Sequence, residues 1–414
     1  MKILFFASYP TLAIGYSRIG NILTNYLAEL GHDVYYFGIS NFGNNLIERH
    51  VHPSIKIIDA IEEEKKLGNN ELYGVNSICD WITKLNPDIL FLYNDIIVIS
   101  RIFNNFVSRN IDESKFHTIT YVDLVYPWEK IDILKFIDAH TDTFVVFGNY
   151  WKKNLIQMGF DDNKIKILPH GFDTDLFYQI DVADAKKYYG FELDDFVILN
   201  TNRNSYRKCI DKTIDAFIKF LKLKNSNPKI KLFLNMMMGG SGANDSGGDY
   251  DIMNCIKVAC LRNQMDFNLV IRSHIFIKPT TKLSDLQQNY LYNACDIGIN
   301  TCIGEGFGLC NLEHGGLGKP QIISNVGELS NIFDSTYSTP IEPIEQFYIP
   351  NNMDFHGGYG MICDTDDFVN AMIKYYDNED LRIEHGKKSQ DIITKRFDWN
   401  NILEELKNII NDEV

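Results

Sequence analysis

The chain has 414 residues, of which 45% are hydrophobic and 23% are charged, and its formal net charge is -15 at pH 7. This composition is typical of folded domains, and the length favours two domains over one. The negative charge argues against a nucleic-acid partner and against an anionic membrane surface, because both attract basic proteins. Peripheral contact with a membrane of another kind stays open.

Eight cysteines occur without a CxxC pair, which favours reduced thiols in a cytoplasmic compartment over a disulfide framework. The apolar run that begins at Met1 is short and ends in a glycine-containing turn, so we interpret it as a buried strand and not as a signal peptide. No apolar segment approaches the ~18 residues of a membrane span. Five cysteines lie in or beside apolar stretches: Cys79, Cys209, Cys295, Cys302 and Cys310.

Short apolar runs alternate with helical stretches along the first 170 residues. The stretch 17–31 shows the helical period, with apolar residues on one face and Gly31 as its end. Strands that alternate with helices predict a parallel sheet with right-handed crossovers. The predicted strands are KILFFAS (2–8), DVYYFGIS (33–40), DILFLYN (88–94), HTITYVD (117–123), TFVVFG (143–148) and KIKILPHG (164–171).

A polar, acidic stretch at 178–194 interrupts this rhythm and is interpreted as a linker. The strand pattern then restarts, which predicts a second doubly wound α/β domain. We therefore expect a domain at 1–180, a second at 181–394 and a C-terminal helix at 395–414 that packs back on the first. The second set of predicted strands is FVILNTN (196–202), KIKLFLNMM (229–237), FNLVIRS (267–273), DIGINT (296–301) and PQIISNV (320–326).

Two segments lack this pattern. Residues 236–251 are rich in glycine, serine and aspartate, and either form a solvated insertion or cover a binding site. Residues 338–360 are rich in proline and aromatic residues and either flank a site or cover a sheet edge. Ligands of doubly wound sheets bind outside the carboxyl ends of the strands, so we expect the two domains to share a cleft lined by those loops.

The stretch EGFGLCNLE combines two carboxylates with a glycine-rich turn directly after a predicted strand. A helix is expected over 308–318, and its first N–H groups have no partners within the helix and are suited to bind an anion. Glu305 and Glu313 would repel a phosphate but accept hydrogen bonds from hydroxyl groups. The pattern therefore favours a sugar that is attached to a phosphate.

The same stretch resembles the E-x7-E signature of the retaining glycosyltransferases of family 4, which have the two-domain GT-B fold built from Rossmann-like domains. The resemblance runs along almost the whole chain. It implies that Glu305 lies against the donor sugar and that Glu313 accepts hydrogen bonds from the ribose. The backbone between them, at Gly306, Phe307, Gly308 and Leu309, is implied to bind the donor, with Phe307 facing the cleft.

Two further stretches carry the resemblance. NRNSYRKCID (202–211) is similar to the Arg-x4-Lys element of the family, which implies Arg203 and Lys208 as ligands of the diphosphate and leaves Arg207 solvated. LPHGFDTDLF (168–177) resembles the run that closes the first domain. Its DTD also looks like a metal-binding DxD motif, but the family element explains it and enzymes of this fold work without a bound metal.

The chain departs from the family at two places in the first domain. Only Gly15 stands where relatives have two glycines, so Gly15 is a candidate backbone contact and Arg18 a weaker one. Asp123 lies where many relatives have a histidine near the reacting carbon, and either acts on the acceptor hydroxyl or caps the next segment. His170 and His314 are interpreted as structural.

The resemblance implies a hexosyltransferase that uses a nucleotide sugar as co-substrate, with GDP-mannose as the first candidate and a UDP-sugar as the second. The acceptor is expected to be a glycan or another hydroxyl compound, and neither a metal nor a cofactor is expected. A non-catalytic nucleotide-sugar-binding scaffold and a sugar epimerase of the same fold are the alternatives. A dehydrogenase is disfavoured because no GxGxxG follows the first strand.

Overall fold

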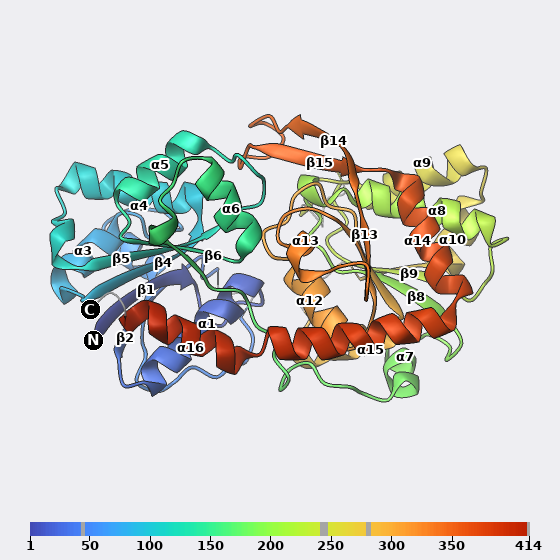
Figure 1. Cartoon of the computed structure of the whole chain (residues 1–414), viewed down its shortest axis with the longest axis horizontal. Helices are drawn as coiled ribbons and strands as arrows, with labels where there is room; N and C mark the ends of the chain where they lie inside the picture. Colours follow the sequence, from blue (N-terminus) through green and yellow to red (C-terminus); the bar gives the residue numbers. More distant parts are fainter. Residues whose placement is uncertain (43–45, 241–246, 279–282, 412–414) are drawn as a thin grey trace. The chain divides into compact units, whose positions relative to one another are not determined.

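The computed structural model describes residues 1–42, 46–240, 247–278 and 283–411. The chain divides into two compact units, which are drawn in Figure 1. Unit 1 comprises Met1–His170 and Trp399–Val414, and unit 2 comprises Gly171–Asp398. Part of the glycine-rich segment 236–251, at 241–246, lies outside the described residues.

Unit 1 contains a seven-stranded parallel sheet with the order β3-β2-β1-β4-β5-β6-β7. Its central strands are almost wholly buried, as expected of a parallel sheet covered by helices on both faces. The apolar runs of the sequence therefore form strands in the predicted places, and β3 is the one that was not predicted. The strands are β1 (Lys2–Ser8), β2 (Asp33–Ile39), β3 (Lys56–Asp59), β4 (Ile89–Asp95), β5 (His117–Asp123), β6 (Thr143–Val146) and β7 (Ile165–Ile167).

Helices cover the sheet of unit 1, and the C-terminal helix is one of them. The final helix lies beside the first one in Figure 1, and the Tyr26 hydroxyl donates to Glu404 Oε1 at 2.8 Å. The helices are α1 (Gly15–Glu29), α2 (Ala60–Lys66), α3 (Ser77–Leu85), α4 (Ile96–Arg109), α5 (Ile131–Ala139), α6 (Asn149–Gln157) and α16 (Trp399–Asn411), with 3-10 turns η1 (Glu113–Lys115) and η2 (Asp162–Lys164).

Unit 2 contains a six-stranded parallel sheet with the order β10-β9-β8-β11-β12-β13 and a separate antiparallel hairpin, β14-β15. The strands are β8 (Phe196–Asn200), β9 (Ile230–Asn235), β10 (Ile275–Lys278), β11 (Ile297–Asn300), β12 (Gln321–Ser324), β13 (Thr339–Ile341), β14 (Pro343–Tyr348) and β15 (Tyr359–Cys363). The helices are η3 (Tyr206–Lys208), α7 (Val182–Tyr189), α8 (Ile210–Leu223), α9 (Ile252–Asn263), α10 (Phe267–Ser273), α11 (Asp285–Ala294), α12 (Leu309–Gly316), α13 (Leu329–Ile332), α14 (Thr365–Asp377) and α15 (Glu379–Arg396).

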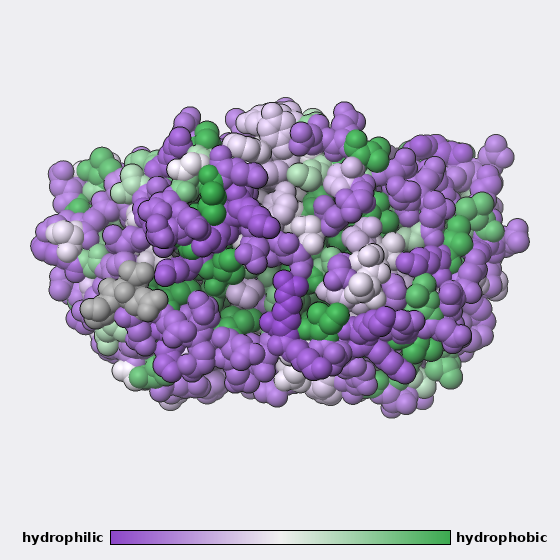
Figure 2. Space-filling view, viewed as in Figure 1, coloured by the Kyte–Doolittle hydropathy of each residue, from purple (hydrophilic) through white to green (hydrophobic). Residues whose placement is uncertain are grey.

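The surface is mainly hydrophilic on the face shown in Figure 2, where apolar residues occur in small separate groups. Buried apolar side chains from the strands and from α8, α9 and α14 form the core of unit 2. None of the helices in the described ranges combines the length and the apolarity that a membrane span requires.

The division between the units falls ten residues earlier than the predicted boundary at 180. Residues 171–180 pack on unit 2: Ile180 N donates to Asn293 Oδ1 at 3.1 Å, and Phe172 forms a β-bridge with Asp398. The predicted linker at 178–194 contains α7, which Asp181 caps at its N-terminus. The polar composition of this stretch reflects a surface helix and not an extended linker.

The run FNLVIRS was predicted as a strand and forms α10 instead. Asp266 caps the helix by accepting from Leu269 N at 2.9 Å, and Val270 is its buried residue. An aspartate directly before a short apolar run is a helix start signal, and a run of seven residues cannot be assigned by periodicity alone. The edge strand β10 follows at Ile275–Lys278.

The segment 338–360 showed no period in the sequence, but it begins with β13 and continues into the hairpin β14-β15. Strand β15 donates from Met361 N to Ile303 O at 2.8 Å, in the loop that follows β11. The hairpin therefore packs beside that loop.

Candidate functional site

The sheet of unit 2 has a topological switch point between β8 and β11, which are neighbours in the sheet although the chain continues from β8 to the opposite side. Asn200 ends β8 and Asn300 ends β11, and both are buried. The turn η3 follows β8, and the glycine-rich turn 304–308 follows β11. A parallel sheet binds ligands at such a point, so this position defines the candidate site.

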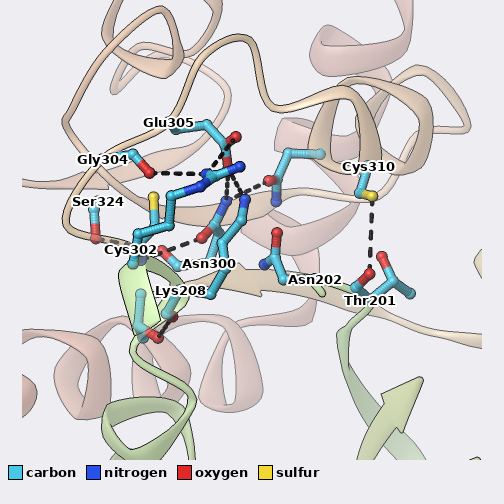
Figure 3. Close-up of polar contacts among 12 residues, drawn as sticks. Thr201, Asn202, Lys208, Asn300, Cys302, Gly304, Glu305, Cys310 and Ser324 are labelled. Atoms are coloured by element: carbon cyan, nitrogen blue, oxygen red, sulfur yellow. Dashed lines mark hydrogen bonds and ion pairs between the residues drawn. The ribbon is translucent and has the colours of Figure 1, made fainter. Parts of the chain in front are cut away.

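Glu305 is the centre of the polar group at this point, with 5% of its surface exposed. Its Oε2 contacts Lys208 Nζ and accepts from Asn300 Nδ2 at 3.2 Å, as Figure 3 shows. Its Oε1 lies 3.3 Å from Arg207 Nη1, which also donates to Gly304 O at 3.1 Å. The carboxylate is therefore enclosed by two cations and an amide.

This environment keeps Glu305 ionised. Burial alone would raise the pKa of the carboxyl group, but the charges of Lys208 and Arg207 outweigh burial and lower its pKa to about 2. A buried carboxylate without such partners would take up a proton instead. The site thus holds a fixed negative charge beside two positive charges.

Arg203 and Arg207 both follow β8, and the structure brings Arg207, the one not expected to bind, into contact with Glu305. Arg203 is exposed, whereas Arg207, which was expected to be solvated, is half-buried against Glu305. The backbone explains the difference, because η3 begins after Ser205, and Ile303 N donates to Arg207 O at 2.9 Å. This backbone bond places Arg207 against the loop that carries Glu305.

The glycine-rich turn requires glycine at its last position. Gly308 has φ +87°, and a Cβ atom there would lie 2.3 Å from Leu329 Cδ2. Helix α12 begins at the next residue, Leu309, so the turn delivers the first N–H groups of the helix to the switch point. The side chain of Phe307 was expected to face a cleft, but it is buried, with its ring 5.9 Å from that of Phe397.

Glu313 lies one turn further along α12 and is 2% exposed. Its Oε2 accepts from the Tyr292 hydroxyl at 2.8 Å and from Gln288 Nε2 at 3.1 Å, both on α11. Tyr292 and Gln288, two neutral donors, thus contact Glu313, and two cations contact Glu305. The neighbouring His314 is buried, and its Nδ1 lies 3.1 Å from Gln321 Nε2. Burial lowers the pKa of His314 to about 3, so the imidazole is neutral.

Unit 1 holds a second polar group, at the carboxyl ends of β4 and β5. Asp123 ends β5, and its Oδ2 accepts from the Tyr16 hydroxyl at 2.6 Å. Gly15 is exposed and begins α1, directly before Tyr16. The Tyr16 ring lies 5.0 Å from that of Tyr93, whose hydroxyl lies 3.3 Å from Nε2 of the buried His170. The hydrogen bond from the Tyr16 hydroxyl places Tyr16 beside Asp123.

Arg18 is buried close enough to His170 to affect it. Burial first, and the charge of Arg18 second, lower the pKa of His170 to about 3, so this imidazole is neutral.

The three D-x-D stretches of the sequence serve local structure. Asp173 Oδ1 accepts from Asp175 N and Leu176 N, both at 3.0 Å. Asp251 caps α9, and Asp364 caps α14. Within the described ranges, no group of three or more histidine, cysteine, aspartate or glutamate side chains could hold a metal ion.

Five partners in these two groups were missed in the sequence: Arg207, Asn300, Tyr292, Gln288 and Tyr16. The sequence could have indicated Asn300, because this residue lies at the end of a predicted strand, at the edge of the sheet where ligands bind. It indicated Tyr16 more weakly, through the neighbouring candidate Gly15. Tyr292 and Gln288 are four residues apart on α11, a spacing that puts them on one helix face without showing what that face meets.

No family model matches the chain. An uncharacterized glycosyltransferase of Methanocaldococcus jannaschii is 22% identical over 285 residues, a match that covers 66% of this chain and 63% of that relative. The alignment thus spans less than two thirds of the relative's length.

Solved structures match the whole chain. Sucrose-phosphate synthase from Thermosynechococcus elongatus aligns with a TM-score of 0.72 at 16% identity, covering 100% of this chain and 98% of that one. Anabaena HepE in complex with UDP and glucose aligns with a TM-score of 0.70 at 13% identity, covering 100% of both chains. The chain has the GT-B fold, with two Rossmann-like α/β units.

Proposed function

We propose that the chain is a retaining glycosyltransferase that transfers a hexose from a nucleoside diphosphate sugar to a hydroxyl group of a glycan or another acceptor. The observation that carries the proposal is the buried Glu305 beside Lys208 and Arg207 at the switch point of unit 2. A carboxylate suits sugar hydroxyls, and cations suit a diphosphate. A nucleotide sugar combines both chemistries, and the fold and the M. jannaschii relative support the same function.

In this proposal, the donor lies along the edge of the unit 2 sheet. Arg203, Lys208 and the N–H groups from Gly306 to Leu309 bind the diphosphate, since a helix start favours anions. Glu305 accepts from the hexose hydroxyls, and Glu313 accepts from the ribose. Binding the ribose would require Glu313 to share or exchange its present donors, Tyr292 and Gln288.

The transfer step needs no metal in this proposal, because side-chain cations supply the positive charge. The bond between the anomeric carbon and the phosphate oxygen breaks while the acceptor oxygen bonds to that carbon on the same face. The proton of the acceptor hydroxyl passes to the departing phosphate oxygen. Lys208 stabilises the charge that develops on that oxygen.

The donor has two candidates. The family resemblance favours GDP-mannose, whereas the HepE complex with UDP and glucose favours a UDP-sugar. A thermal-shift panel of GDP, UDP, ADP and their sugars separates them, because a ligand that binds only the folded chain raises its melting temperature. A shift with one nucleotide and its sugar identifies the donor. No shift with any of them contradicts the proposal.

Catalysis is tested separately from binding by Glu305→Gln, with release of the nucleoside diphosphate from the donor as the assay. We expect the variant to bind the nucleotide and to lose about 10²- to 10³-fold in turnover, the usual effect of removing one electrostatic contact to a transition state. Glu345→Gln, at an exposed position of β14, is the matched control. Arg203→Ala should weaken both binding and turnover. Nucleotide binding without turnover in the wild type would favour the alternative of a non-catalytic nucleotide-sugar-binding scaffold.

A further inference from the structure

Arg207 and Lys208 contact different oxygens of the Glu305 carboxylate. Arg207 Nη1 approaches Oε1, while Lys208 Nζ and Asn300 Nδ2 approach Oε2. Arg207 also donates to the carbonyl of Gly304, the residue before Glu305. One guanidinium therefore binds both the side chain and the main chain of the loop that presents the carboxylate.

The proposed function requires Lys208 to contact two different anions. In the structure its ammonium contacts Glu305, and in the donor complex it contacts a diphosphate, which carries more negative charge. The ammonium is a compact charge on a flexible stem and is able to turn from one anion to the other. After that movement, the buried Glu305 would keep only Asn300 and Arg207 of these three partners.

We propose that Arg207 is the positioning residue that keeps Glu305 ionised and in place when Lys208 turns to the diphosphate of the donor. This inference rests on the proposed function. The planar guanidinium suits the role, because it donates in fixed directions and remains charged. The side chain of Arg207 is 21% exposed and that of Glu305 is 7% exposed, so water screens this pair less than a surface ion pair.

The experiment compares Arg207→Ala and Arg207→Lys with Arg203→Ala, which removes the exposed arginine of the same segment after β8. Steady-state turnover of the donor identified by the thermal-shift panel is measured from pH 4 to pH 8, and nucleoside diphosphate binding is measured by calorimetry. For Arg207→Ala we expect kcat to fall about 10- to 100-fold, since small misplacements of a group at the reacting centre have effects of this size.

The donor KM and nucleotide affinity of Arg207→Ala should stay within about 3-fold of the wild type, because the diphosphate ligands remain. A fall in turnover on the acid side should appear within the measured pH range, because Glu305 loses a cation that favours its charged form and its pKa rises from about 2. Arg207→Lys should restore part of kcat and part of the wild-type dependence of turnover on acidic pH. Arg203→Ala should raise KM and weaken nucleotide binding without this fall on the acid side.

Two outcomes overturn the inference alone. An unchanged kcat and an unchanged dependence of turnover on acidic pH in Arg207→Ala would make Arg207 a surface residue, and a loss of nucleotide affinity with the larger effect on KM would make it a diphosphate ligand. If Arg207→Ala does not fold, Arg207→Lys and Arg207→Gln are measured, and the same criteria apply. A wild-type chain that neither binds nucleotides nor releases them from a donor would contradict the proposed function itself, before any variant is made.

Discussion

The two units each place a carboxylate at the carboxyl end of a central parallel strand, but they hold it differently. In unit 2, Glu305 follows β11 and is enclosed by Lys208, Arg207 and Asn300. In unit 1, Asp123 ends β5 and accepts a hydrogen bond from the neutral Tyr16. Two cations and an amide thus contact the carboxylate that follows β11, whereas a phenol contacts the carboxylate that ends β5.

The difference sets what each carboxylate is suited to do. Cations lower the pKa of Glu305 to about 2, so it is a permanent acceptor of hydrogen bonds. Burial first, and the charge of Asp123 second, raise the pKa of the Tyr16 phenol well above its usual range, so Tyr16 stays protonated and donates. A phenol orients a carboxylate without supplying a positive charge.

The largest expected effect comes from breaking the ion pair in unit 2. Lys208→Met should lower the free energy of unfolding by about 3 kcal/mol, the lower end for a broken buried pair, because Arg207 and Asn300 still contact Glu305. Chemical denaturation measures the change, and Arg203→Met is the exposed control. Adding Glu305→Gln to Lys208→Met should recover part of the loss. A double variant no more stable than the single one would show that the pair is not coupled.

A smaller effect is expected from removing the phenol in unit 1. Tyr16→Phe keeps the ring beside Tyr93 but removes the donor to Asp123, which should cost about 1.5–3 kcal/mol in the free energy of unfolding. Tyr26→Phe removes a hydroxyl bond to Glu404 at the surface and should cost less than about 1 kcal/mol. Equal losses in the two variants would mean that the Tyr16 bond has no special weight.

The smallest expected effect is a pH dependence that sharpens the comparison. The folded pKa of Glu305 is about 2, below its ordinary value of 4.5, so its stabilising contribution is complete above pH 4.5 and is lost as the pH falls towards 2. The stability difference between the wild type and Glu305→Gln should therefore shrink by about 1 kcal/mol between pH 5 and pH 3.5. Urea denaturation at several pH values measures it, and a constant difference would contradict the assignment.

Much of the fold was predictable because local patterns and tertiary structure agree. Buried parallel strands need continuous apolar runs, and such runs mark β1, β2, β4 to β9, β11 and β12 in their observed places. Where the pattern was short or polar it misled: FNLVIRS forms α10, and the polar stretch at 178–194 contains α7. A seven-residue stretch with four apolar residues fits a strand or a capped helix equally well, and its neighbours in space decide which one forms.

The sequence by itself determined the strand pattern, the glycine at the end of the acidic turn and the spacing of Glu305 and Glu313, because each follows from local backbone geometry. Only the tertiary structure decided that Arg207 and not Arg203 meets Glu305, and that Tyr16 meets Asp123. Both outcomes depend on contacts between segments that are about 100 or more residues apart. Such contacts arise from the order of strands in a sheet and from how loops meet at its edge, which no local pattern encodes.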